Sequence, residues 1–194
     1  EFGIPENNVI LLSVGRLAKE KKIDEIIKYI NMIKRENISM LIVGDGPYRN
    51  KLEKEVQELN LGNKVIFAGM ISPEEVPSYY QLGDIFISAS NSETQGLTYL
   101  EALASGLPSV CKSDPCIKDV IINGYNGFQY DSFESFENHI NYIIDNKEIY
   151  GSLSENARLT AEKYTTGLFA DKVESLYERV IYEYSNSSQI DKEA

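Results

Sequence analysis

Two glutamates, Glu93 and Glu101, flank Gly96 in the stretch of sequence that carries the most chemistry. A helix that begins near Gly96 would direct its free backbone N–H groups and the positive end of its dipole toward an anion. The two carboxylates could then accept hydrogen bonds from hydroxyls on either side of that anion, as in a sugar phosphate. The alternative is that Glu93 is a helix-start charge and Glu101 lies on a solvated face.

A basic segment, from Gly15 to Lys21, follows the first apolar run of the chain. The glycine permits a tight turn, while Arg16 and Lys21 stand where two cations could grip a diphosphate. Lysine and arginine mostly stay exposed, so taken alone this segment is more often solvated surface than a phosphate site.

A glycine-rich turn, Gly44-Asp45-Gly46-Pro47, follows the second apolar run. Its glycines would let backbone approach a ligand closely, and its proline suits the first position of a helix. A plain turn is the simpler interpretation, because these residue types occur in loops of every kind. No G-x-G-x-x-G opens a helix here, which disfavours a hydride-transfer enzyme.

The elements that must position these residues alternate between strands and helices. Apolar runs predict strands at residues 9–14, 40–43, 65–67, 84–88, 109–111 and 127–130. Helical spacing of apolar residues lies between them, and two further helices are expected to close the chain. This alternation predicts an α/β, doubly wound parallel sheet, in which ligands bind outside the carboxyl ends of the strands.

The composition is that of an acidic globular chain. Its 194 residues suit a single domain over 1–194, with a core at about 8–184 and a polar, frayed tail at 185–194. A net charge of -11 argues against a nucleic-acid partner, because such proteins concentrate cations against phosphates. Cys111, expected in the core, and Cys116, expected in a loop, lack zinc-site spacing, so we expect no structural metal and a cytoplasmic setting. The chain starts just ahead of its first apolar run, and we expect it to be part of a longer protein.

Five short motifs in order resemble the C-terminal, donor-binding domain of the GT-B retaining glycosyltransferases of family 4, or group 1. They are Gly15-Arg16 with Lys21, Gly44-Asp45-Gly46-Pro47, Val65-Ile66-Phe67-Ala68-Gly69, Glu93 with Glu101, and Ala104-Ser105-Gly106-Leu107-Pro108. Each motif is modest, but their order makes a specific signal over roughly residues 8–184. The resemblance implies a Rossmann-like sheet that forms one half of a two-domain GT-B architecture, whose N-terminal acceptor domain is absent from this chain.

The resemblance also implies a role for each motif. Arg16 and Lys21 would neutralise the donor diphosphate as the sugar leaves, and Glu93 would hold sugar hydroxyls, so these three are the expected catalytic residues. Glu101 would bind the ribose. The other expected donor-binding residues are Gly15, Gly44, Gly46, Phe67, Ala68, Gly69, Met70, Gly96, Leu97 and Thr98. Family members usually need no metal or other cofactor, since a cationic pair can do the charge work of Mg²⁺.

One departure from the family narrows the expectation. Thr94-Gln95-Gly96 stands where the family commonly has Gly-Phe-Gly. This version resembles the branch that glycosylates diacylglycerol and related bacterial cell-envelope acceptors, and the contacts of Thr94 and Gln95 are left open. By analogy with that branch, the full-length enzyme would associate peripherally with the inner face of the membrane. The family's catalytic-side histidine lies in the N-terminal domain, so His139 is expected on a helix surface.

The leading expectation is an enzyme fragment that binds a nucleotide-diphosphate sugar, with UDP as the expected nucleotide. It would contribute to transfer of a hexose to a lipid or glycan acceptor with retention, which in this family is thought to proceed by same-face attack. Alone, the chain should bind the donor and lack complete activity. The alternatives are a non-catalytic nucleotide-sugar-binding module, or a related GT-B epimerase or phosphorylase.

The resemblance implies one further feature, at the end of the chain. In the two-domain architecture the C-terminal helix crosses back onto the N-terminal domain. Leu168, Phe169, Leu176 and Tyr177 should therefore form an exposed apolar patch that could drive dimers or crystal contacts.

Overall fold

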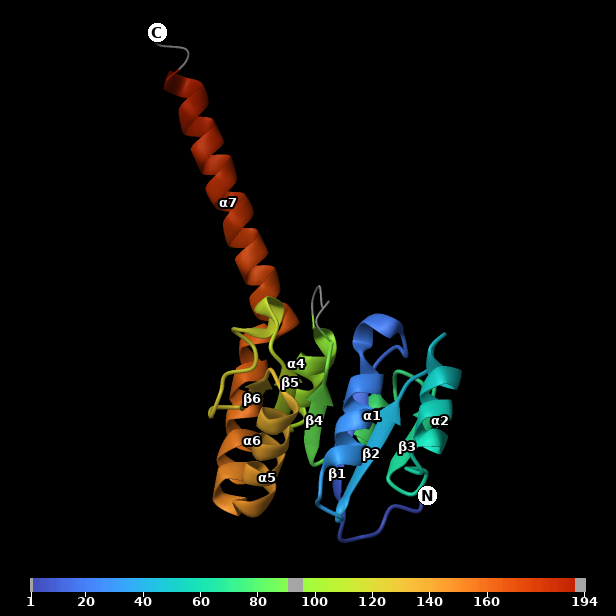
Figure 1. Ribbon diagram of the computed structural model, residues 1–194. Helices are drawn as coiled ribbons and strands as arrows, with labels where there is room; N and C mark the ends of the chain where they lie inside the picture. The colour runs from blue at the N-terminus through green and yellow to red at the C-terminus, as the bar shows by residue number, and fades with distance from the viewer. Residues whose placement is uncertain (1, 91–95, 191–194) are drawn as a thin grey trace.

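The computed structural model describes residues 2–90 and 96–190 and contains one parallel sheet at its centre (Figure 1). The spatial order of the strands is β3-β2-β1-β4-β5-β6. The strands are β1 (Val9–Val14), β2 (Ile38–Val43), β3 (Val65–Gly69), β4 (Ile85–Ser88), β5 (Ser109–Lys112) and β6 (Gly127–Tyr130). The sheet confirms the predicted Rossmann-like α/β fold, with each expected strand in place.

Two strand starts differ from the sequence prediction by one or two residues. β2 begins at Ile38, because the chain pairs with Val9 of β1 from that residue onward. β4 begins at Ile85 rather than at Asp84. The Asp84 backbone N–H donates to the Ile10 carbonyl at 2.9 Å, and its side chain accepts from the Ile10 N–H at 2.7 Å, so Asp84 closes the end of the β1–β4 pair.

Helices cover both faces of the sheet, because alternate residues of each buried strand point to opposite sides. Leu11, Met40 and Val110 pack with α1, α2 and α5 on one face, whereas Leu12 and Leu41 pack with α3 and α4 on the other. α6 lies along α4 and α5. The helices are α1 (Ile23–Met32), α2 (Arg49–Glu58), α3 (Val76–Tyr80), α4 (Leu97–Ala104), α5 (Phe133–Asp145) and α6 (Lys147–Ala161). Short 3-10 turns occur at Lys19–Lys21, Pro115–Ile117 and Glu162–Tyr164.

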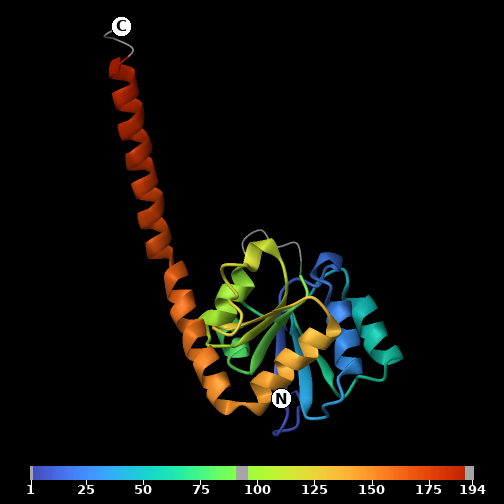
Figure 2. The ribbon, with the colours of Figure 1, turned by 60° about the vertical axis from the view of Figure 1, so that its left-hand side comes forward.

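The last helix, α7 (Thr166–Ile190), extends away from the sheet and its covering helices (Figures 1 and 2). Many of its large apolar side chains between residues 168 and 184 are exposed, with Phe169 at 68% and Tyr177 at 66%. The exposed apolar patch expected at this face is therefore confirmed. The expected frayed tail is corrected in part, since the backbone stays helical over 185–190.

His139 lies on α5 and is half-buried rather than on an open helix surface. Its ring stacks on Phe128 of β6 with centroids 4.5 Å apart, and burial lowers the pKa of the imidazole. Cys111 is fully buried in the core, as predicted, and Cys116 is exposed in the 3-10 turn after β5.

Candidate functional site

The strand order creates a switch point between β1 and β4. β1 is followed in the chain by its neighbour β2 on one side, while β4 is followed by β5 on the other, so the loops at their carboxyl ends diverge and leave a crevice. A cavity of about 20 Å³ at this point is bordered by Gly15, Arg16 and Lys21 from the first loop and by Thr98 from α4. The structure thus brings together residues that stand far apart in the sequence.

A larger cavity of about 680 Å³ adjoins the same loop. Its walls include Gly15 and Arg16, the turn with Gly44 and Gly46, and Met70 after β3. This volume falls within the range of ligand pockets, roughly 300–1,000 Å³. The first three strand-end loops therefore share one cavity.

Glu101 borders a third cavity, of about 490 Å³, next to the second one. Val76 lines both, which makes them neighbours. The Tyr80 hydroxyl donates to Glu101 Oε2 at 2.8 Å, so the carboxylate is held in place by a buried phenol from α3. Burial, together with the Glu101 charge, raises the pKa of Tyr80 well above its usual range. Sequence reasoning missed Tyr80 because its spacing is that of an ordinary core residue.

The glycines of the second loop have a packing role that the sequence prediction did not include. A Cβ on Gly44 would lie 2.0 Å from the Gly15 carbonyl oxygen, and one on Gly46 would lie 2.4 Å from that of Leu17. The Gly44 N–H also donates to the Gly69 carbonyl at 2.8 Å. Glycine is needed here for contact between loops, whatever the cavity holds.

Arg49 holds this loop in place through contacts with three neighbouring side chains. Its guanidinium bonds Asp45 at 2.9 Å and Glu53 at 2.7 Å, and it lies over the Phe67 ring at 6.0 Å. Asp45 in turn accepts the Gly46 N–H at 2.6 Å. That hydrogen bond and Arg49 lower the pKa of the Asp45 carboxyl. The i, i+4 charge spacing was the signal that could have identified this network.

The start of α4 has the geometry expected of an anion site. Gly96 precedes the helix with φ at 60°, a left-handed conformation that favours glycine. Among the residues that the structure describes, no side-chain hydrogen bond caps this helix start. The first N–H groups of a helix lack intrahelical acceptors, and here they belong to Leu97 and Thr98. Glu93, Thr94 and Gln95 lie outside the described residues.

Some predicted site residues stand apart from these cavities. Phe67, Ala68 and Gly69 line none of the three, and Phe67 instead packs beneath Arg49. Leu97 is 59% exposed on α4. Met70, which was predicted, and Ile71, which was not, follow β3 and line the larger cavity.

Two polar pairs near the carboxyl edge of the sheet were also missed. Lys112 at the end of β5 bonds Glu25 of α1 at 2.7 Å, and Ser88 of β4 lies 2.8 Å from the Tyr99 hydroxyl. Both pairs tie helices to strands that end at the crevice. Their partners are distant in sequence, so no local pattern marks them.

Within 2–90 and 96–190, no group of three or more histidine, cysteine, aspartate or glutamate side chains could hold a metal ion. No helix in that part of the chain is long and apolar enough to cross a bilayer.

Comparison with known proteins decides the family. The family model described as "Glycosyl transferases group 1" matches residues 1–160. The chain belongs to the group 1 glycosyl transferases. The sheet and crevice described above are therefore those of a group 1 domain, and solved structures of similar fold are GT-B glycosyltransferases.

Two curated relatives of this group 1 domain are alpha-monoglucosyldiacylglycerol synthases. The Acholeplasma laidlawii protein is 34% identical over 91% of this chain and 45% of its own length. The Streptococcus pneumoniae protein is 42% identical over 67% of this chain and 30% of its own length. The chain thus spans less than half the length of these relatives.

A solved structure of similar fold is the pneumococcal O-GlcNAc transferase GtfA in complex with UDP and GlcNAc. It superimposes with a TM-score of 0.79 at 23% identity, over 90% of this chain and 36% of that protein. At that identity the match concerns the fold.

Proposed function

We propose that this chain is the donor-binding domain of a retaining hexosyltransferase that uses a UDP-sugar and a lipid or glycan acceptor. The observation that carries the proposal is the convergence of three cavities at the switch point, lined by Arg16 and Lys21, by Gly44 and Gly46, and by Glu101. These residues come from separate loops and from α4, and the cavities that they border are neighbours that share lining residues such as Arg16 and Val76.

The chemistry of the crevice suits a sugar nucleotide. Arg16, Lys21 and the start of α4 supply positive charge for a diphosphate, and that charge would stabilise the leaving UDP without a metal ion. Glu101, held by Tyr80, offers an acceptor for ribose hydroxyls. The cavity behind Gly44 and Gly46 has room for the base.

Support for the donor and the acceptor comes from the relatives. The similar fold with UDP and GlcNAc makes UDP the first nucleotide to test. The two synthases named for monoglucosyldiacylglycerol make glucose and diacylglycerol the first sugar and acceptor to test. In this proposal Glu93 contacts the sugar, and attack occurs on the face from which UDP departs.

The remainder of the protein would complete the enzyme. The acceptor site belongs in the part that the relatives contain and this chain lacks, and the full-length protein would work in the cytoplasm, at the inner face of the membrane. Because this domain carries an acidic excess, contact with an anionic surface is assigned to the missing part.

A transfer assay on the full-length protein tests the proposal. UDP-glucose and diacylglycerol vesicles are supplied with EDTA present, and NMR of the glycolipid gives the configuration at the anomeric carbon. We expect an α-linked product, and Arg16→Ala should reduce its rate without abolishing folding. A β-linked product would contradict retention. Binding of UDP-glucose without transfer to any lipid or glycan would favour a non-catalytic binding module.

A further inference from the structure

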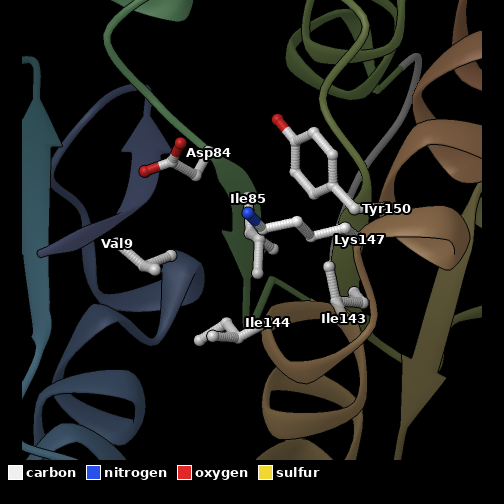
Figure 3. A pocket seen from close by; sticks show the side chains of 7 residues that line it. All are labelled: Val9, Asp84, Ile85, Ile143, Ile144, Lys147 and Tyr150. Carbon is white, nitrogen blue, oxygen red and sulfur yellow. The ribbon is translucent and has the colours of Figure 1, made fainter. Parts of the chain in front are cut away.

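A further cavity, of about 340 Å³, lies at the opposite end of the sheet from the crevice. Figure 3 shows the side chains that line it. It is bordered by Val9 and Ile85, the first residues of β1 and β4, and by Ile143 and Ile144 near the end of α5. β1 alone separates the two ends by about 17 Å, at ~3.3 Å per residue. None of the residues assigned to the donor lines this cavity.

The four aliphatic side chains form the apolar floor of this cavity. Its other lining residues carry polar groups, namely the Asp84 carboxylate, the Lys147 ammonium and the Tyr150 hydroxyl. Asp84 Oδ2 accepts from the Ile10 N–H at 2.7 Å, which leaves Oδ1 available. Figure 3 shows Lys147 extending from α6 toward the middle of the group, with Asp84 and Tyr150 on either side in this view.

The opposite charges in this cavity are not joined to each other. Among the described residues, no ion pair links Asp84 with Lys147, and no hydrogen bond occupies the Lys147 ammonium or the Tyr150 hydroxyl. Burial raises the pKa of Asp84, against the effect of its hydrogen bond with Ile10. Burial and the Asp84 charge raise the pKa of Tyr150, and the Arg158 charge acts in the opposite direction. The cavity therefore combines an apolar floor with one available carboxylate oxygen of the half-buried Asp84, the ammonium of the exposed Lys147 and the phenol of Tyr150.

We propose that this pocket binds a free α-amino acid with a branched aliphatic or aromatic side chain. Its ammonium would meet Asp84, its carboxylate would meet Lys147 and Tyr150, and its side chain would cover the floor. An amphiphile with a single charge fits less well. The carboxylate of a fatty acid would be repelled by Asp84, and the ammonium of an alkylamine would be repelled by Lys147. A zwitterion neutralises both, and about 340 Å³ lies within the usual range of ligand pockets.

Calorimetric titration of this chain with L-leucine and L-phenylalanine tests the proposal. Isopentylamine and 4-methylpentanoate, which each lack one charge, and L-serine, which lacks the apolar group, serve as matched ligands. We expect one saturable site for the two apolar amino acids. Each matched ligand should bind about tenfold more weakly or worse, as expected for loss of one charge-assisted contact or of the apolar group.

Variants locate the site. Asp84→Asn keeps an acceptor for the Ile10 N–H, and Lys147→Met keeps the aliphatic stem, so both should fold and both should lose about tenfold in affinity. Ile144→Trp should fill the cavity and abolish binding while thermal melting stays cooperative. Lys163→Met, on the exposed 3-10 turn, should bind as the original chain does.

Three results would overturn the inference. The first is the absence of saturable binding, which would result if Lys147 turned to pair with Asp84. The second is an affinity that stays unchanged in Asp84→Asn and Lys147→Met. The third is competition by UDP. Competition by UDP would place the amino acid in the donor crevice. Because the two sites share no residue, failure here leaves the proposed function standing.

Discussion

Arg49 ties the turn that lines the larger cavity to the neighbouring strand β3. It holds Asp45, whose side chain fixes the Gly46 N–H, and it supports Phe67 from the neighbouring strand. Such a residue can shape a nucleotide pocket without touching the nucleotide. Its effect should therefore appear in the affinity for UDP as well as in stability.

Arg49→Gln tests this role. Loss of its charged hydrogen bonds should lower the free energy of unfolding only slightly, because these side chains are partly exposed to solvent. It should also weaken UDP binding, because the turn at 44–47 becomes looser. Arg35→Gln is the matched control, since Arg35 bonds Asn141 and Asp145 away from the crevice. Denaturant unfolding and calorimetry should show a stability loss in both variants and an affinity loss only in Arg49→Gln. Equal UDP affinity in the two variants would contradict the assignment.

Tyr80→Phe tests the orientation of Glu101. Removing the buried hydroxyl deletes its bond to the carboxylate and should cost about 1 kcal/mol of stability. If Glu101 binds the ribose, the ratio of the affinity for UDP to the affinity for 2′,3′-dideoxy-UDP should be smaller in this variant than in the original chain. Tyr79→Phe changes the adjacent ring, which packs on Phe2, and should leave the preference intact. A preference that survives in Tyr80→Phe would remove Glu101 from the ribose site.

At the scale of elements, α5 is coupled to β6 by the stacked ring of His139. Burial lowers the pKa of this histidine from 6.5, so the folded state takes up its proton less readily than the unfolded state. Unfolding therefore binds a proton below pH 6.5, and stability should fall as the pH is lowered through that value. Melting temperatures measured across this range should show a slope that disappears in His139→Gln. An unchanged slope would show that other groups dominate the acid response.

The strands and helices were predictable from sequence because their apolar periodicity is strong. The apolar run at 9–14 predicts a buried strand, and the spacing of the isoleucines in α1 predicts the buried face of a helix. The structure contains both elements at these positions. The order of the strands in space could not be obtained in this way. The order depends on which helices cover which face of the sheet. The sequence does not show on which of the two faces a residue such as Tyr80 packs.

The candidate site was predictable only where a motif marked it. Motifs predicted Arg16, Gly44 and Glu101, and the structure places each of them beside a cavity. Lys112 and Glu25 were missed because their contact joins β5 to α1 across the fold. Local spacing carries no information about such a pair, so it becomes visible only in three dimensions.

At the scale of the whole molecule, α7 is the element without a covering layer. Phe169, Leu176, Tyr177 and Val180 recur at helical spacing and are all exposed. Exposed apolar stripes of this kind mark contact surfaces. In the isolated chain we expect this stripe to promote self-association.

Sedimentation analysis tests that expectation. The isolated chain should show a concentration-dependent increase in mass, and a Phe169→Glu, Tyr177→Glu double variant should remain monomeric with an unchanged melting temperature. Lys172→Glu on the same helix adds negative charge without removing apolar surface and serves as the control. A chain that stays monomeric at all concentrations would show that the exposed stripe does not pair with itself.

The most direct test of the donor-binding assignment is calorimetric titration of this chain with UDP and UDP-glucose, with and without Mg²⁺. Arg16→Ala and Glu101→Ala are compared with the surface variant Lys163→Ala. We predict metal-independent binding that the first two substitutions weaken by about tenfold each and the third leaves unchanged. An absence of binding to either ligand, or binding unaffected by Arg16→Ala and Glu101→Ala, would contradict the assignment of the crevice as the donor site.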